Sequence, residues 1–290
     1  MGTSASNTGP TGRIPLLPNW APDAFPDASP DVEEDFDKTD GGDPASELPK
    51  STEDSKTKPT TKLPQQTNSW RSARSAIREY ASNKTKENLK KSGKRYVRTY
   101  GGAGAATRAS AKGIDYGLAL GTFLGGFSQG GYEANLQRYD LSECIGKSSE
   151  EVLARIADRI APIGSTNDEA IARGAIMDSL DNLYERIVTD GGDIESLGSL
   201  DEITLKETVM EFVSNYIFKK WIYELGLALE KNNLSEKAVI RLENEIRSFI
   251  KNEVQFALKD KDVKALDLRE GEGRKVIQEI FELAYLTIEK

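Results

Sequence analysis

The chain has 290 residues, of which 37% are hydrophobic and 30% charged, and its formal net charge is -8 at pH 7. It contains no histidine, so the commonest general base, the commonest metal ligand and the Ser-His and Cys-His nucleophile pairs are all absent. This composition argues against a hydrolase, and we expect a non-enzymatic protein with no catalytic residue, metal site or cofactor of its own. The single cysteine, Cys144, is expected to be a small core residue in a reducing cytoplasm.

Residues 1–69 are predicted to form a long disordered tail, because Pro, Ser, Thr, Gly and Asp dominate them. One apolar segment interrupts this composition, and its prolines favour an extended backbone that loses little entropy on docking in a groove. The apolar residues of this segment are Ile14, Leu16, Leu17 and Trp20. We interpret residues 1–22 as a docking peptide and the rest of the tail as an acidic linker. The alternative is a mere scattering of apolar residues in a loop.

No secretory signal is visible at the start of the chain. Arg13 is the only positive side chain there, and Leu16-Leu17 is too short for the apolar region of a signal peptide. We therefore expect a cytoplasmic protein. The longest weakly polar stretch, Ile114 to Phe127, contains Asp115 and falls short of the roughly 20 apolar residues that a spanning helix needs. No membrane association is expected from it.

Charge is unevenly distributed along the chain. Residues 1–70 hold 6 basic and 12 acidic side chains, a net of -6; residues 71–100 hold 10 and 2, a net of +8; residues 101–290 hold 23 and 33, a net of -10. The three values sum to the net charge of -8. A basic segment thus separates an acidic tail from an acidic body, and it can bind its own tail, an acidic partner or a nucleic-acid backbone.

The basic segment is predicted to form one or two helices that begin near Ser69. Arg71, Arg74 and Arg78 then lie on roughly one face, and three tyrosines follow along the segment. Basic residues interleaved with aromatic ones can contact nucleic acid. A solvated helix face of an acidic protein has a similar composition, so both interpretations stay open.

Small residues recur at every fourth position after the basic segment. As a helix they would form one stripe along which another backbone can approach closely, and we expect helix packing there with a break near Gly130-Gly131. The stripe consists of Gly101, Ala105, Ala109, Gly113, Gly117, Gly121 and Gly125.

Gly146-Lys147-Ser148 resembles the end of a phosphate-binding loop, but no apolar strand leads into it. Ser148 and Glu151 instead form a capping-box pattern ahead of a helix.

The rest of the chain repeats its apolar residues at helical spacing. The predicted faces are Val152, Leu153, Ile156 and Ile160; Ile176, Leu180, Leu183, Tyr184 and Ile187; Val209, Phe212, Val213, Tyr216 and Ile217, continued by Phe218, Trp221, Ile222, Leu225 and Leu229; Leu242, Ile246, Phe249 and Ile250; and Val276, Ile277, Ile280, Phe281, Ala284 and Ile288. The widest of these faces, from Val209 to Leu229, implies a helix that is buried on several sides. We predict an all-α fold: a basic and then Gly/Ala-rich helical segment at 70–132 and an all-α domain at 133–290.

Several groups of residues carry a resemblance to a known family. They are Met1-Gly2-Thr3-Ser4, Ser6, Gly9-Pro10, Pro15-Leu16-Leu17-Pro18-Asn19-Trp20-Ala21, Ser148-Ser149-Glu150-Glu151-Val152-Leu153, Glu169-Ala170-Ile171-Ala172-Arg173, Asn215-Tyr216-Ile217 and the segment from Asp262 to Gly273. On these residues the chain resembles the QatB family, the helical component of the four-protein Qat anti-phage defence system of bacteria. The similarity spans both ends of the chain and skips the linker from Phe25 to Gln66.

The resemblance implies a set of partners and a modification. QatB-like proteins go with the ATPase QatA, the TatD-like nuclease QatD and QatC, a QueC-like enzyme of 7-deazaguanine chemistry that is expected to use ATP and a 7-deazaguanine precursor. The QueC-like enzyme is thought to join a deazaguanine base to the amino-terminal glycine of its partner, which by similarity is Gly2 after removal of Met1. The residues expected to contact that enzyme are Thr3, Ser4, Ser6, Ile14, Leu16, Leu17 and Trp20.

Two other classes of function stay open at this point. Residues 1–6 also satisfy the N-myristoylation pattern, which would make the chain a membrane adaptor. The basic segment would instead make it a nucleic-acid-binding subunit through Arg71, Arg74 and Arg78. An acyl adduct on the terminal amine would indicate the first, and salt-sensitive binding of DNA or RNA the second.

Overall fold

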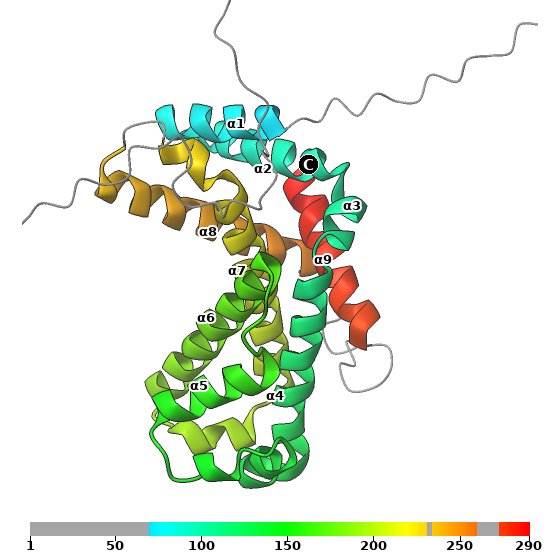
Figure 1. Cartoon of the computed structure of the whole chain (residues 1–290), viewed down its shortest axis with the longest axis vertical. Coiled ribbons are helices and arrows are strands. Elements are labelled where there is room, and N and C mark those ends of the chain that lie inside the picture. Colours follow the sequence, from blue (N-terminus) through cyan, green and yellow to red (C-terminus); the bar gives the residue numbers. More distant parts are fainter. Residues whose placement is uncertain (1–69, 231–233, 260–272) are drawn as a thin grey trace, which may run out of the picture. The chain divides into compact units, whose positions relative to one another are not determined.

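Helices make up all the regular structure that the computed structural model describes, which covers residues 70–230, 234–259 and 273–290 (Figure 1). The elements are α1 (Trp70–Ser82), α2 (Lys86–Tyr100), α3 (Ala103–Arg108), α4 (Ala111–Arg138), η1 (Ser142–Cys144), α5 (Ser149–Ile160), α6 (Asn167–Thr189), η2 (Ile194–Ser199), α7 (Glu202–Glu230), α8 (Glu236–Leu258) and α9 (Gly273–Glu289). The all-α prediction is confirmed for these ranges. The predicted tail, residues 1–69, lies outside them.

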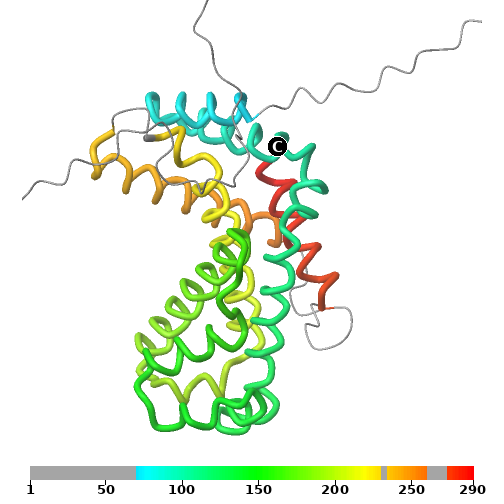
Figure 2. Tube along the Cα trace, viewed as in Figure 1, coloured from blue at the N-terminus to red at the C-terminus, as the bar shows by residue number. Residues whose placement is uncertain are grey.

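Helix α7 is the central element of the described helical body. It packs against α1, α4, α6 and α8 (Figure 2). Phe212, Tyr216 and Trp221 are fully buried. Phe212 and Tyr216 face α4, whereas Trp221 packs against Tyr96 on α2 and Phe249 on α8. The sequence-based prediction of a helix that is covered on several sides is therefore confirmed.

The basic segment forms two helices, α1 and α2, as the sequence allows. Helix α1 begins at Trp70, next to the predicted start. Thr85 caps α2 by accepting a hydrogen bond from the backbone N–H of Asn88, and Gly101 ends it in the left-handed conformation with φ of 100°. Helix α1 packs against α2 and α7, and α2 packs against α9, so the segment belongs to the body of the protein.

The small-residue stripe does not form the single helix that its four-residue period suggests. Helix α3 ends at Arg108 and α4 begins at Ala111, so the stripe is broken at Ala109. The carbonyl of Ala109 accepts a hydrogen bond from the buried ammonium of Lys220 at 3.0 Å. The hydroxyl of Ser110 lies 2.8 Å from that of Tyr285, so α7 and α9 hold this turn in place.

Within α4 the small residues do permit close helix packing. A Cβ atom at Gly113 would lie 2.7 Å from the ring of Tyr216 on α7, and one at Gly117 would lie 2.9 Å from the ring of Phe212. The predicted break near Gly130-Gly131 is confirmed, because Gly131 has φ of 77° and kinks α4. Two further local predictions are confirmed: Ser148 caps α5 by accepting a hydrogen bond from the backbone N–H of Glu151, and Cys144 is buried.

No helix within the described ranges has both the length and the apolar character that a bilayer crossing requires.

Candidate partner-binding site

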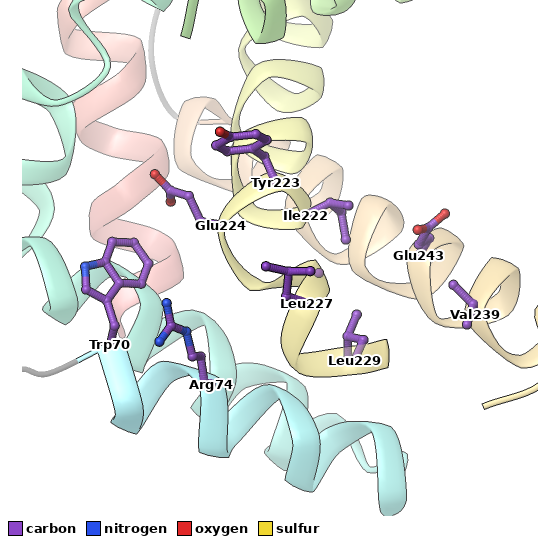
Figure 3. Close-up of a pocket in the computed structure, with 10 residues that line it drawn as sticks. Trp70, Arg74, Ile222, Tyr223, Glu224, Leu227, Leu229, Val239 and Glu243 are labelled. Atoms are coloured by element: carbon purple, nitrogen blue, oxygen red, sulfur yellow. The ribbon is translucent and has the colours of Figure 1, made fainter. Parts of the chain in front are cut away.

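A groove opens between α1, α7 and α8 at the point where the described body begins (Figure 3). Its volume is about 680 Å³. Helix α1 contributes Trp70 and Arg74, α7 contributes Tyr223 and Leu227, and α8 contributes Glu243. Pockets of about 300–1,000 Å³ commonly hold a small ligand or a few side chains. This groove, which we name the α1/α7/α8 groove, is thus large enough for part of a peptide.

An exposed apolar ridge forms one side of the α1/α7/α8 groove. Leu227 is 71% exposed and Tyr223 is 55% exposed. The two are four residues apart and therefore stand one above the other on the same face of α7. Their neighbours Trp221 and Leu225 are buried in the core. Both side chains line the groove, and the Tyr223 hydroxyl accepts a hydrogen bond from the side-chain amide of Asn167. Exposed apolar residues beside a pocket suit a contact surface.

The wall of the groove next to α2 is built by a buried polar cluster. Glu224 accepts hydrogen bonds from the hydroxyls of Tyr96 and Tyr100. Burial raises the pKa of the Glu224 carboxyl above its ordinary value, and the two tyrosine hydroxyls offset part of that rise. Burial and the charge of the Glu224 carboxylate raise the pKa of the Tyr100 hydroxyl far above its ordinary value.

An aromatic cluster fixes the position of Trp70 at the rim. The Trp70 ring packs edge-on against Tyr100 at 5.6 Å and against Tyr96 at 6.4 Å, and Tyr96 in turn stacks on the buried Trp221 at 5.0 Å. Edge-on and offset aromatic pairs add roughly 0.5–1.5 kcal/mol each to area burial. The rim is thus preorganised at the residue where the N-terminal tail joins the body.

Two charged groups on opposite sides of the groove lack an ion-pair partner among the described residues. Arg74 on α1 is exposed and Glu243 on α8 is half-buried. Figure 3 shows them on either side of Leu227. No salt bridge joins either group to another residue in the described ranges. A bound segment with a charge of its own can therefore find an opposite charge at the groove.

The three arginines predicted to contact nucleic acid lie on α1. Arg71 and Arg74 are exposed, whereas Arg78 is half-buried and donates a hydrogen bond to the carbonyl of Arg74 at 3.1 Å. Other basic residues of the segment are engaged within the body, since Lys91 pairs with Glu79 at 2.7 Å. The structure thus brings Arg74 to the groove, and nucleic-acid contact by these arginines stays a prediction.

The remaining predicted site residues lie outside the described ranges. They are Gly2, Thr3, Ser4, Ser6, Ile14, Leu16, Leu17 and Trp20. The groove itself was missed from the sequence, where Ile222 and Leu229 counted only as core. The sequence did contain one indication of it: α7 has more apolar residues than the core buries, and Tyr223 and Leu227 are the ones left exposed.

One protein family matches this helical body. Its description is "Qat anti-phage system associated protein QatB", and its sequence profile matches residues 101–288. The chain belongs to the QatB family. It is accordingly a component of the Qat anti-phage system. No curated protein and no solved structure matches the chain.

The family match divides the elements that build the groove. It begins at Gly101, after α2, so it includes α7 and α8 but neither α1 nor α2. The rim residues Trp70 and Arg74 therefore come from a segment that precedes the matched region, yet this segment packs on α7 within the same compact unit. The groove thus combines helices inside the matched range, α7 and α8, with one outside it, α1.

Proposed function

We propose that this chain is a non-enzymatic subunit that presents its N-terminal peptide to a QueC-like partner enzyme of the Qat system. Gly2, exposed after removal of Met1, is the residue to which that enzyme joins a 7-deazaguanine base. Membership of the QatB family carries the proposal, because it assigns the chain to the system in which such a partner is expected. The opening motif of residues 1–20 supplies the peptide.

The chemistry of the terminal amine favours Gly2 over any lysine. An α-amine has a reference pKa of about 7.7–8.0, so about a fifth of it is neutral and nucleophilic near pH 7.2, whereas lysine amines near 10.4 are almost entirely protonated. Glycine has no Cβ and can enter a narrow channel backbone first. Thr3, Ser4 and Ser6 offer hydroxyls to the channel walls, and Ile14, Leu16, Leu17 and Trp20 anchor the peptide on the enzyme surface.

In this proposal the helical body binds the partner proteins, and the tail places the terminal amine in the active site of the QueC-like enzyme. The ATPase and the TatD-like nuclease of the system are further candidate partners. This chain is expected to hold no cofactor of its own, and ATP and the 7-deazaguanine precursor are expected to bind to the partner enzyme. An exposed apolar ridge beside a groove, at the start of the body, gives the chain a surface suited to holding a peptide.

Mass spectrometry of the intact chain and of its tryptic peptides, after co-expression with the QueC-like partner, tests the proposal. We expect an adduct on the tryptic peptide that ends at Arg13, and we expect Gly2→Glu to abolish it. The matched control Lys50→Arg, which removes a tail lysine, should leave the adduct in place. An unmodified terminus in the presence of the partner would contradict the proposal, and a fatty acyl mass would indicate a myristoylated membrane adaptor instead.

A second candidate function is nucleic-acid binding by α1. The exposed guanidinium groups of Arg71 and Arg74 favour it. Gel shifts with the double variant Arg71→Glu/Arg74→Glu should then show weaker binding, and the affinity of the original chain should fall steeply with salt. The double variant Arg155→Glu/Arg159→Glu on α5 is the matched control, since it changes the net charge by the same amount elsewhere on the body. Binding that survives in the double variant would rule out α1 as the contact.

A further inference from the structure

The α1/α7/α8 groove is an unfilled apolar surface at the junction with the N-terminal tail. We propose that it binds the chain's own segment Ile14–Trp20, so that the N-terminal peptide is held on the body until a partner takes it. The docking itself is independent of the proposed function. Its regulatory consequence rests on that function, because the same segment is the expected anchor on the QueC-like enzyme.

The apolar chemistry of segment and groove agrees. The ridge of Tyr223 and Leu227 is more than half exposed and has no apolar cover among the described residues. Ile14, Leu16, Leu17 and Trp20 form the densest apolar group of residues 1–69. Two prolines within that segment favour an extended backbone, which lies along a groove at little cost in entropy. The volume of about 680 Å³ accommodates a few of these side chains.

The length of chain between segment and groove permits the contact. Trp20 and Trp70 are separated by the 49 residues from 21 to 69, and Trp70 itself lines the groove. A coil of that length has an end-to-end distance of about 35–42 Å, and its contour is several times longer. The docking is intramolecular, so the effective concentration of the segment is of millimolar order. An affinity that would be weak between separate molecules is sufficient here.

Charge complementarity points to the same occupant. Arg13 is the only basic side chain among the first 37 residues, and it directly precedes Ile14. Glu243 borders the groove, is half-buried and has no salt bridge to another described residue. An incoming Arg13 supplies the missing charge.

Trypsin cleavage of the bond between Arg13 and Ile14, measured on the full chain without any partner, tests the docking. Cleavage requires the segment to leave the groove, so its rate follows the fraction of undocked chain. The rate at Lys38, in the same tail but away from the segment, is the internal reference. We expect Leu227→Asp to raise the ratio of cleavage at Arg13 to cleavage at Lys38 by about fivefold or more, because a buried carboxylate opposes docking.

Phe256→Asp is the matched control. Phe256 is 66% exposed on α8, about 20 Å along the helix from Glu243, so it introduces the same charge at a similarly exposed apolar site outside the groove. Its cleavage ratio should equal that of the original chain, and Leu227→Met should keep the protection. A ratio for Leu227→Asp within twofold of the original value would overturn the proposal, as would an equal increase in Phe256→Asp.

A photo-crosslinking side chain at position 16 separates docking within one chain from docking between two. We expect crosslinks to α1, α7 or α8 at the mass of a single chain, unchanged on tenfold dilution. Crosslinked dimers that disappear on dilution would assign the groove to a second copy and refute the intramolecular contact. Both measurements omit the QueC-like enzyme, so their failure is distinct from a missing N-terminal adduct, which refutes the proposed function alone.

Discussion

Replacing Gly113 by alanine should destabilise the body although alanine is the better helix former. The added Cβ would lie 2.7 Å from the ring of Tyr216 and 2.9 Å from that of Phe281. Both rings are fully buried and pack against each other at 5.4 Å, so neither can move aside without disturbing the core. Overpacking of this kind costs about 1–3 kcal/mol. The gain in helix propensity is about 1 kcal/mol.

Gly174→Ala on α6 separates the two effects. At Gly174 the nearest atoms belong to the flexible side chain of Lys219, at 3.5 Å, which is an ordinary contact. This variant should be more stable than the original chain by up to about 1 kcal/mol. Urea unfolding should therefore place Gly113→Ala about 1–3 kcal/mol below Gly174→Ala. In a thermal scan each kcal/mol corresponds to about 2–4 °C for a body of this size. Equal stabilisation of both variants would refute close packing at Gly113.

Two further predictions concern charges in the same body. The carboxylate of Glu169 pairs with Lys112 at 2.7 Å and, with further hydrogen bonds at the start of α6, its pKa is lowered to about 2. Because the pKa of Glu169 is lower in the folded chain than in the unfolded one, its carboxylate adds to the free energy of unfolding above about pH 4.5, and this contribution is lost as the pH falls to about 2. In urea titrations Glu169→Gln should therefore destabilise the chain at pH 7 and have no effect near pH 2. Lys220 is buried and lies 2.6 Å from Asp168, so Lys220→Met should cost about 3 kcal/mol. Lys251→Met, which removes an exposed cation, should cost under about 1 kcal/mol, and equal costs would contradict the burial argument.

Helix positions and their buried faces follow from the sequence because helices are local structures. The apolar residues of α5, α6, α8 and α9 recur at a spacing that places them on one side of a helix, those of α7 cover several sides, and nearly all of them are buried. The cap at Ser148 and the kink at Gly131 likewise depend on residues a few positions away. Such features need no knowledge of distant elements.

The small-residue stripe shows where local reasoning fails. Its four-residue period runs through Ala109 without interruption, and nothing nearby in the sequence marks a break. The break is stabilised by Lys220, which is 111 residues away and donates to the Ala109 carbonyl, and by Tyr285 on α9. A hydrogen bond across such a distance in the sequence depends on the packing of α7 and α9 against α3 and α4.

The sequence by itself determined the all-α class, the helical faces of the body and the family resemblance, because periodicity, caps and motifs are written in neighbouring residues. Only the tertiary structure decided that Leu225 is core and Leu227 is a ridge, since exposure depends on where α1 and α8 lie beside α7. It also decided that Glu224 meets two tyrosines from α2. Burial and pairing are properties of several elements together, and the one-dimensional pattern of any single helix does not contain them.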